Sequence, residues 1–345
     1  MKVCVLGAGS WGTALSLVLH GRGEDVTLWS RSQGKLDGIR TAGENRTFLP
    51  GVAVPGDLKL TCDLAECVPD AEAVVFSVPS RATAPLAKEV AGLTRQSGAG
   101  SAGAKDAGKT GAPLIVLTAK GFEPESRRRL SEAVGDSLPR ERVAVLAGPS
   151  HAEEVARRVP TTVVAASYER AAAEETQHLF STDRFRVYTN HDIIGVETAT
   201  ALKNVIALAA GICDGLGFGD NAKGALLTRG LAEMSRLGVE LGGDPATFAG
   251  LAGMGDLITT CISPHSRNRS FGEAIGRGKS AEEAERASVM VVEGVGTTKI
   301  AAELAREHDI EMPITFEVES VLLRGKKPMD AMADLMTRDL KAEVW

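Results

Sequence analysis

Residues 2–15 read KVCVLGAGSWGTAL, a short apolar run that meets three glycines and then continues in a helix-like pattern. The run at 2–6 predicts a buried strand, and the glycines that follow it have the spacing G-x-G-x-x-G. In this context Gly7 permits a tight turn, Gly9 lets a pyrophosphate approach the backbone, and Gly12 lets helix and strand pack closely. The free amides and the positive end of the helix dipole then face the phosphates. We therefore expect a dinucleotide-binding unit at the start of the chain.

Similar apolar runs recur through the first 190 residues. They alternate with helical patterns, which is typical of βαβ units and a mainly parallel sheet. Because the runs are continuous rather than alternating, they indicate strands that are covered on both faces. The predicted strands are 2–6, 25–29, 73–78, 113–119, 142–147, 161–166 and 184–189, with an extra strand near a sheet edge at 58–62.

After Asn190 the pattern changes to Ala-, Leu- and Glu-rich helical stretches separated by glycine turns. We therefore predict an α/β fold in which a Rossmann-like, mainly parallel sheet over residues 1–190 is followed by an all-helical C-terminal domain over 191–345. A ligand is expected in the crevice between the two domains. The stretch RQSGAGSAGAKDAGKTGA at 95–112 is rich in Gly, Ala and Ser and predicts a surface loop.

Composition narrows the class of protein. The formal net charge of the 345 residues is −6, which argues against a nucleic-acid partner. The five cysteines form no CxxC pair, so we expect free thiols and neither a disulfide scaffold nor a metal site. There is no signal-peptide pattern and no run of about 18 uncharged apolar residues, so we expect a cytoplasmic protein without a membrane segment.

The end of the second predicted strand bears on which dinucleotide is bound. Domains selective for NAD carry Asp or Glu there, whereas this chain reads Trp29-Ser30-Arg31. A carboxylate would repel the 2′-phosphate of NADP(H), whereas a guanidinium binds it through charge-assisted hydrogen bonds. We therefore expect NADP(H) as the preferred cofactor, with NAD(H) possible. The alternative is that Arg31 is an ordinary solvated loop residue.

Three other predicted strands also end in polar residues, at the sheet edge where such folds bind ligands. SVPS at 77–80 ends the third strand, and Lys120 directly follows the strand at 113–119. The stretch AGPSHAEE at 147–154 places Ser150 before a helix start, where an anion is favoured. The alternative for Lys120 is a surface lysine.

The helical half supplies further candidates. Lys203 lies in a mostly apolar helix, where burial lowers a lysine pKa and prepares it for proton exchange near neutral pH. Its alternative is a lysine that snorkels along the polar stripe. Asp256 follows a glycine-rich turn, GLAGMGD, and has the alternative of a simple helix N-cap. The cluster SRNR at 266–269 is rich in donors and suits a phosphate.

The sequence motifs of this chain, in the order in which they occur, resemble those of NAD(P)-dependent glycerol-3-phosphate dehydrogenases of the bacterial type. The resemblance covers nearly the whole chain and runs through GAGSWGTAL, NRTFLPG, VPS, TAKGFE, AGPSHAEE, ETATALKNV, GMGDLITTC, SRNRSFG and VVEGVGTT. It implies a reversible hydride transfer between NAD(P)H and dihydroxyacetone phosphate that gives sn-glycerol 3-phosphate, a precursor for glycerophospholipid synthesis. We also expect a homodimer.

The resemblance implies residue roles as well. Lys203 becomes the general acid and base, Lys120 polarises the carbonyl, and Asp256 orients Lys203. The implied substrate-binding residues are Lys120, Gly148, Ser150, Lys203, Asp256, Ser266, Arg267 and Asn268. The expected cofactor-binding residues are Gly7, Gly9, Ser10, Trp11, Gly12, Arg31, Lys120, Ala152, Arg267, Val291 and Glu293.

Three alternatives stay open from the sequence. A related two-domain dehydrogenase acting on a β-hydroxy acid would share the glycine loop. A non-catalytic regulator would bind NADPH without turnover. An S-adenosylmethionine-dependent methyltransferase would also use a glycine loop, although Arg31 and the two lysines argue against it.

Overall fold

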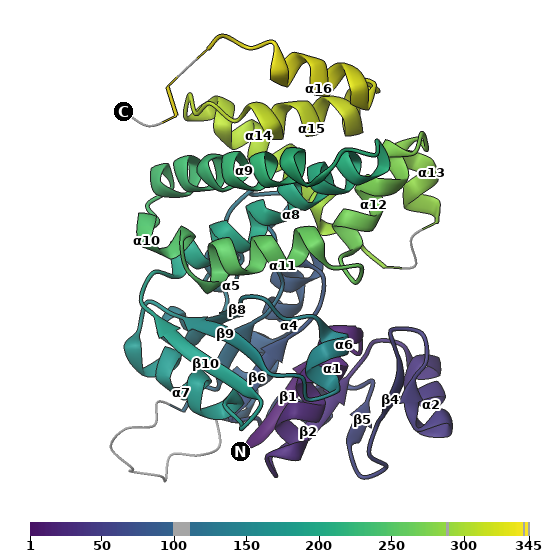
Figure 1. The fold of residues 1–345 in the computed structure, drawn as a ribbon. Coiled ribbons are helices and arrows are strands. Elements are labelled where there is room, and N and C mark those ends of the chain that lie inside the picture. Colours follow the sequence, from purple (N-terminus) through teal and green to yellow (C-terminus); the bar gives the residue numbers. More distant parts are fainter. Residues whose placement is uncertain (99–110, 288–289, 341, 344–345) are drawn as a thin grey trace.

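The chain folds into a sheet-based half and a helical half that lie one above the other (Figure 1). The computed structural model describes residues 1–98, 111–287, 290–340 and 342–343. In the view of Figure 1 the N-terminal sheet lies below and the later helices are stacked above it. The predicted class, a Rossmann-like sheet followed by helices, is confirmed.

Within the described residues, eight strands form one sheet in the order β10-β9-β8-β7-β6-β1-β2-β5. Neighbouring strands run parallel except for β8 and β9, which pair antiparallel. The strands of this sheet are β1 (Lys2–Leu6), β2 (Asp25–Trp29), β5 (Lys59–Thr61), β6 (Ala73–Phe76), β7 (Leu114–Leu117), β8 (Val143–Ala147), β9 (Thr161–Ala166) and β10 (Phe185–Asn190).

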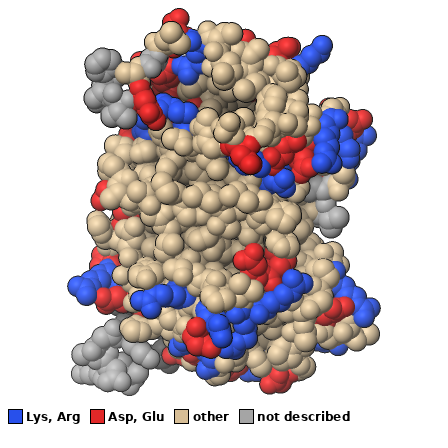
Figure 2. All heavy atoms as spheres, viewed as in Figure 1, with Lys and Arg blue, Asp and Glu red and all other residues tan. Residues whose placement is uncertain are grey.

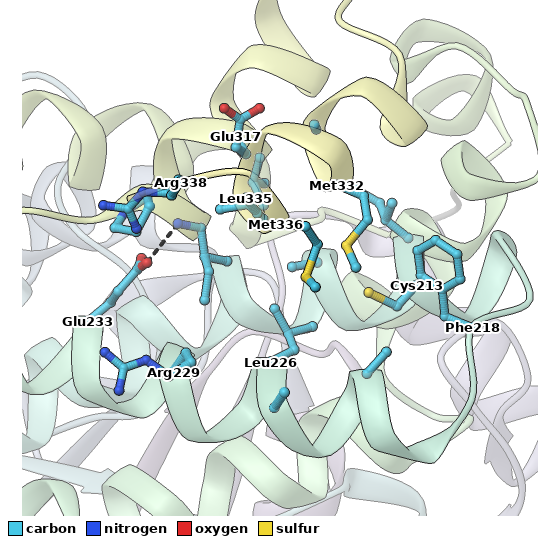
Figure 3. Close-up of a pocket in the computed structure, with 18 of the residues that line it drawn as sticks. Cys213, Phe218, Leu226, Arg229, Glu233, Glu317, Met332, Leu335, Met336 and Arg338 are labelled. Carbon is cyan, nitrogen blue, oxygen red and sulfur yellow. Dashed lines mark hydrogen bonds between the residues drawn. The ribbon is translucent and has the colours of Figure 1, made fainter. Parts of the chain in front are cut away.

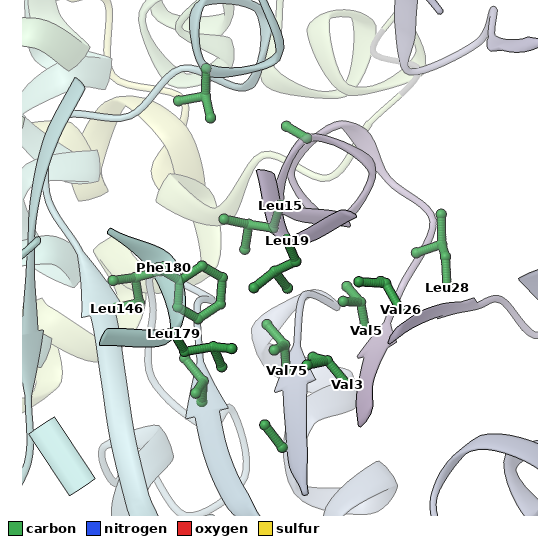
Figure 4. Close-up of a cluster of buried hydrophobic side chains, with 14 of the residues drawn as sticks. Val3, Val5, Leu15, Leu19, Val26, Leu28, Val75, Leu146, Leu179 and Phe180 are labelled. Atoms are coloured by element: carbon green, nitrogen blue, oxygen red, sulfur yellow. The ribbon is translucent and has the colours of Figure 1, made fainter. Parts of the chain in front are cut away.

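Helices cover both faces of the sheet, which explains the continuous apolar runs. On one face Val3 and Val5 pack toward Leu15, Leu19 and other residues of the helices on that side (Figure 4). On the other face Cys4 and Leu6 belong to a second buried cluster. The sheet half contains α1 (Ser10–Gly21), α2 (Gln33–Ala42), α3 (Leu64–Cys67), α4 (Ser80–Gly98), α5 (Leu130–Val134), a 3₁₀ turn (Arg140–Arg142), α6 (Ala152–Ala156) and α7 (Arg170–Phe180).

The predictions for individual strands and loops of the sheet half are confirmed in one case and wrong in another. The expected strand near a sheet edge is β5, which is confirmed as the last strand of the sheet. The expected loop at 95–112 is wrong at its start because α4 continues to Gly98, and residues 99–110 lie outside the described part of the chain. A small antiparallel pair of β3 (Glu44–Asn45) and β4 (Leu49–Ala53) was not predicted.

The helical half is built around α8 (Ile193–Gly215), which packs against α9, α11, α12 and α14. α8 is long and apolar enough to span a membrane by composition alone, but 94% of its apolar window is buried inside the fold, as for a core helix. The remaining elements are α9 (Asp220–Glu240), α10 (Pro245–Phe248), a π-helical turn (Leu251–Gly255), α11 (Asp256–Ile262), α12 (Arg267–Gly276), α13 (Ala281–Arg286), α14 (Glu293–Glu307), α15 (Pro313–Arg324) and α16 (Pro328–Met336).

α8 and α12 approach each other at backbone distance. A Cβ on Gly211 would overlap the carbonyl oxygen of Arg269, and a Cβ on Gly272 would overlap that of Leu208. Only glycine therefore fits at these two crossing points. The contact fixes the N-terminal residues of α12 relative to the residues on α8.

Candidate active site

The glycine loop between β1 and α1 has the form expected of a phosphate cradle. Gly7 has φ +119°, and a Cβ on it would lie 2.5 Å from Ser77 O. A Cβ on Gly12 would overlap Gly7 O, whereas a Cβ on Gly9 would meet nothing within 4 Å. Gly7 and Gly12 are thus required by the fold itself, and Gly9 leaves open space directly before the helix N-terminus. These residues fit a bound dinucleotide pyrophosphate.

A buried asparagine, Asn45, lies outside the glycine loop in the sequence and binds it through hydrogen bonds. The Nδ2 of Asn45 donates to Ala8 O at 3.1 Å and to the hydroxyl of Thr13 at 2.9 Å. Asn45 is only 2% exposed. No local sequence pattern indicated a role for Asn45, because its two partners come from a distant part of the chain.

The start of α1 and the neighbouring α6 carry three more of the expected cofactor residues. Ser10 is the first residue of α1, and the Trp11 ring lies 6.5 Å from that of Phe185. Ala152, buried, begins α6, which packs against α1. All three residues therefore border the glycine loop or the helix beside it.

Two cations lie just past the carboxyl end of β2. Arg31 is exposed, and the Nζ of Lys35 lies 4.2 Å from the centroid of the Phe48 ring. Burial, together with the charge of Arg31, lowers the pKa of Lys35. Among the described residues neither cation pairs with a carboxylate. This edge of the glycine loop is therefore positively charged and suits a phosphate group.

At the centre of the site, two lysines from different halves of the chain share one carboxylate. The Nζ of Lys203, on α8, donates to Asp256 Oδ1 at 2.6 Å and to the Thr260 hydroxyl at 2.5 Å. The Nζ of Lys120, which follows β7, donates to Asp256 Oδ2 at 2.8 Å and to Gly148 O at 2.8 Å. Asp256 thus binds both ammonium groups, and the N-cap alternative does not describe it.

Burial dominates the electrostatics of this cluster. Lys203 is 4% and Asp256 is 1% exposed, so Lys203 does not snorkel to water. Burial lowers the pKa of Lys203 to about 7, with Lys120 adding to the effect and Asp256 opposing it. Burial works to raise the pKa of Asp256, but the charges of Lys120 and Lys203 outweigh it and lower that pKa. The cluster therefore combines a fixed carboxylate with an amine that can exchange a proton near neutral pH.

A chain of amide hydrogen bonds links this cluster to α12 and α14. Asn204 Nδ2 donates to the backbone oxygen of Lys120 at 3.0 Å. Asn268 Nδ2 donates to Asn204 Oδ1 at 2.9 Å, and Asn268 Oδ1 accepts from the backbone N–H of Gly294 at 3.0 Å. Asn204 was not predicted, although it directly follows Lys203 in the sequence. This hydrogen-bond network holds Asn268 in place, and within the described part of the protein one of its two amide hydrogens has no acceptor and can donate to a ligand.

The other residues from the second half gather at the starts of α12 and α14. Ser266 caps α12 by accepting from Arg269 N at 3.2 Å, and Arg267 Nη1 donates to Val291 O at 3.0 Å. The Glu293 carboxylate accepts from the Ser80 backbone N–H at 3.1 Å and from its hydroxyl at 2.6 Å. Arg267, Val291 and Glu293 therefore lie beside the SVPS strand end of the sheet half.

The guanidinium of Arg269 is turned away from this group. Its Nε donates to Asp214 Oδ2 at 2.7 Å, near the C-terminal end of α8. Of the donor cluster at 266–269, Arg269 is therefore engaged in a structural ion pair instead of facing the lysines.

The turn after β8 completes the wall near Lys120. Gly148 has φ +129°, and the Ser150 hydroxyl donates to Gly148 O at 2.9 Å. Next to it, the Nε2 of His151 is buried without a hydrogen-bond partner among the described residues. Burial lowers the pKa of His151, and Lys120 and Lys203 add to this, so the ring is neutral at pH 7.

A cavity of about 770 Å³ lies elsewhere in the helical half, between α9, α15 and α16 (Figure 3). Its walls are mainly apolar and include Leu226, Met332 and Leu335. The buried carboxylate in its wall, Glu233, accepts from the backbone N–H groups of Ile314 and Thr315 and thereby caps α15. None of the expected site residues lines this cavity, so its size does not make it the candidate active site.

Among residues 1–98, 111–287, 290–340 and 342–343, no group of three or more His, Cys, Asp or Glu side chains is arranged to hold a metal ion.

The sheet half supplies a dinucleotide cradle, and the helical half presents a buried lysine beside a carboxylate. The class that this fold and site define is a two-domain oxidoreductase that uses a nicotinamide dinucleotide.

Comparison with known proteins agrees with this class. The family model described as the NAD-dependent glycerol-3-phosphate dehydrogenase N-terminus matches residues 2–173, and the model of the C-terminus matches residues 192–333. The chain therefore belongs to the NAD-dependent glycerol-3-phosphate dehydrogenase family.

Individual relatives cover all or nearly all of the chain. It is 50% identical to a glycerol-3-phosphate dehydrogenase [NAD(P)+] of Moorella thermoacetica, over 99% of this chain and 98% of the relative. It is 48% identical to one of Thermoanaerobacter sp., over 100% of this chain and 99% of the relative. A crystal structure of glycerol-3-phosphate dehydrogenase from Coxiella burnetii superposes with a TM-score of 0.88 at 40% identity, covering 97% of this chain and 98% of that one.

Proposed function

We propose that this chain catalyses the reversible reduction of dihydroxyacetone phosphate to sn-glycerol 3-phosphate with NAD(P)H. The observation that carries the proposal is the buried Lys203–Asp256–Lys120 cluster beside a glycine loop that fits a dinucleotide. The names of full-length relatives support the choice of substrate.

When bound, the nicotinamide would supply or accept the hydride. The roles of the chain's own residues follow from their charge and protonation. Lys203 donates its proton to the developing alkoxide in reduction and removes the hydroxyl proton in oxidation, which suits an amine with a pKa of about 7. The ammonium of Lys120 stabilises the same developing negative charge. Asp256 holds both Nζ atoms and keeps Lys203 directed into the site.

We assign the substrate phosphate to the start of α12. The Arg267 guanidinium has donors beyond the one that binds Val291 O, and Asn268 retains one amide hydrogen. Ser266, Gly148 and Ser150 would line the remaining wall between α12 and the turn after β8.

We further propose NADP(H) as the preferred cofactor, with NAD(H) accepted. Arg31 and Lys35 form an uncompensated pair of cations past the end of β2, and a 2′-phosphate would neutralise them. The pyrophosphate of the cofactor would be held by the glycine loop and the start of α1, at Gly7, Gly9, Ser10, Trp11 and Gly12. The remainder of the cofactor would be bordered by Ala152, Val291 and Glu293.

The proposed homodimer has support from the surface of the helical half. Met254, Ile258 and Ile262 recur every four residues and are 41%, 41% and 58% exposed. Figure 2 shows that the middle of this face carries few charged side chains. Because such an apolar stripe favours coverage by another protein surface, we infer that a second copy packs on it. A cytoplasmic location would suit the five unbonded cysteines.

A steady-state assay tests the proposed reaction. Purified protein is mixed with NADPH and dihydroxyacetone phosphate, and the fall in nicotinamide absorbance is followed, with 3-oxo acids as rival substrates in parallel. Turnover with dihydroxyacetone phosphate alone is expected. Preference for a 3-oxo acid would favour the β-hydroxy-acid alternative, and NADPH binding without any turnover would favour the regulator.

A further inference from the structure

Two buried cysteines lie against each other in the sheet half. The Sγ of Cys4, on β1, lies 2.6 Å from the Sγ of Cys67, at the end of α3. Cys4 is 0% and Cys67 is 7% exposed. The two residues are 63 positions apart in the sequence, so the fold itself brings them together.

The separation of the two sulfurs is already close to that of a covalent link. A disulfide bond is about 2.05 Å long, so the two sulfurs would only have to move together by roughly 0.5 Å. α3 is a single turn of four residues, from Leu64 to Cys67, and so short an element can adjust locally. The third cysteine of this region, Cys62, is exposed and has no such partner within the described residues.

We propose that Cys4 and Cys67 form a reversible disulfide when the protein meets a peroxide. The Sγ of Cys67 attacks a peroxide oxygen, breaks the O–O bond and becomes a sulfenic acid while one water forms from hydrogen peroxide. The Sγ of Cys4 then attacks the Cys67 sulfur, loses its proton and displaces the hydroxyl as a second water. Two thiols are oxidised by two electrons in total, and one hydrogen peroxide is reduced to two waters. A dithiol reductant reverses the reaction.

Cys67 acts first in this order because it is the more exposed of the two residues, at 7% against 0% for Cys4. The hydrogen bond with Cys67, followed by burial, raises the pKa of Cys4, so Cys4 stays protonated until a sulfenic acid is next to it. The reaction is therefore expected to be slow relative to that of an exposed, ionised cysteine.

The consequence for the protein is a crosslink that leaves the glycine loop in place. The Cys4 side chain belongs to the buried cluster on one face of the sheet, whereas α1 packs on the opposite face. The crosslink ties the strand that leads into the glycine loop to α3 and closes a long stretch of chain. A crosslink that closes a long loop lowers the conformational entropy of the unfolded chain more than one that closes a short loop. We expect oxidation to raise the midpoint of thermal unfolding by about 5 °C or more and to change NADPH-dependent turnover less than about twofold.

The test uses the full chain and a Cys62→Ser variant. Trypsin releases residues 3–22, which contain Cys4, and residues 60–81, which contain both Cys62 and Cys67. Removing Cys62 therefore leaves one thiol in each peptide, and the pairing is read without ambiguity. The folded variant is treated with hydrogen peroxide, the remaining thiols are blocked, and the non-reduced digest is examined by mass spectrometry.

We expect the two peptides joined with the loss of two hydrogens, a product that dithiothreitol removes and that a Cys62→Ser/Cys67→Ser double variant does not form. The unfolding midpoint should rise only in the sample that carries the crosslink. The proposal is overturned if Cys62 of the wild-type protein is oxidised while Cys4 and Cys67 both still react with N-ethylmaleimide after unfolding. A crosslink that appears only when peroxide is added to urea-unfolded protein would overturn it equally.

Discussion

Lys120 and Lys203 come from different halves of the chain, yet their ammonium groups bind the two oxygens of one buried carboxylate. With Asp256 ionised and both lysines protonated, the cluster carries a net positive charge. Such a charge stabilises negative charge on a substrate oxygen more strongly in a buried site than in water. The proposed reaction creates that charge on the substrate oxygen.

Lys203→Ala should lower turnover by about 10²- to 10⁴-fold, because a positioned proton donor contributes an effect of that size. NADPH affinity should stay near normal, since the glycine loop and Arg31 are unchanged. Steady-state kinetics and NADPH titration measure the two quantities. Lys299→Ala, which removes an exposed lysine on α14, is the matched control and should be fully active. Undiminished turnover in Lys203→Ala would remove the residue from its proposed role.

The two reaction directions should respond oppositely to pH near 7. Reduction requires protonated Lys203 and should fall as the pH rises through the pKa of about 7, whereas oxidation requires the neutral amine and should rise over the same range. Profiles of kcat/KM against pH in both directions measure this. Parallel profiles in the two directions would contradict a proton exchange at Lys203.

Asp256→Asn should shift the reductive pH profile to lower pH. The Asp256 charge raises the pKa of Lys203 against the effect of burial, so its removal lets that pKa fall below 7. The variant should also be less stable by about 3–5 kcal/mol, because the buried ammonium groups lose their counter-charge.

Thr260→Val provides the matched comparison for this prediction. It removes the 2.5 Å hydrogen bond to Lys203 without changing any charge. We expect a stability loss of about 1–3 kcal/mol and a smaller shift of the pH profile than in Asp256→Asn. Identical profiles in the wild type and Asp256→Asn would show that the carboxylate does not set the protonation of Lys203.

Arg31→Glu should change the ratio of NADPH to NADH affinity by roughly 10- to 100-fold in favour of NADH, the value of one to two charge-assisted hydrogen bonds. Lys35→Met should produce a smaller change in the same direction, because it removes a charge without adding a repulsive one. Titration with both cofactors gives the ratio. Arg40→Glu, which makes the same charge change on α2 (Gln33–Ala42), is the control, and its ratio should match the wild type. An unchanged ratio in Arg31→Glu would exclude a contact with the 2′-phosphate.

Two alanine substitutions in the glycine loop should separate folding from binding. Gly12→Ala should destabilise the protein by about 1–3 kcal/mol, because its methyl group would overlap Gly7 O. Gly9→Ala should destabilise the protein by only about 1 kcal/mol or less, because its methyl group meets open space and the remaining cost is that of alanine at the N-cap of α1. It should nevertheless weaken NADPH binding. Normal binding in Gly9→Ala would place the pyrophosphate elsewhere.

Much of the sheet could be predicted because each buried strand is a continuous apolar run. The antiparallel direction of β9 could not, since a run such as TTVVAA at 161–166 looks the same in either direction. The β3–β4 pair escaped prediction because β3 has two residues and no apolar pattern. The division between residues 190 and 191 stays a prediction, although β10 ends at Asn190 and α8 begins at Ile193.

The candidate site was predictable where a residue has an unusual local setting. Lys203 has an apolar helix around it, and Lys120 follows a buried strand. Asn204 has the same apolar helix around it as Lys203 and was overlooked, whereas Asn45 has no such signal, because it joins elements that are far apart in the sequence. The partners of both residues depend on tertiary contacts that no local pattern encodes. The catalytic and binding roles themselves stay predictions until the variants above are measured.

The glycine contacts between α8 and α12 have a consequence for selectivity. Lys203 belongs to one of these helices and Arg267 begins the other, and neither helix can slide without a clash at Gly211 or Gly272. The distance between Lys203, the proposed proton donor, and Arg267, the proposed phosphate ligand, is therefore fixed by the packing of α8 on α12. A substrate whose carbonyl and phosphate are one carbon farther apart could contact Lys203 or Arg267, but not both residues at once.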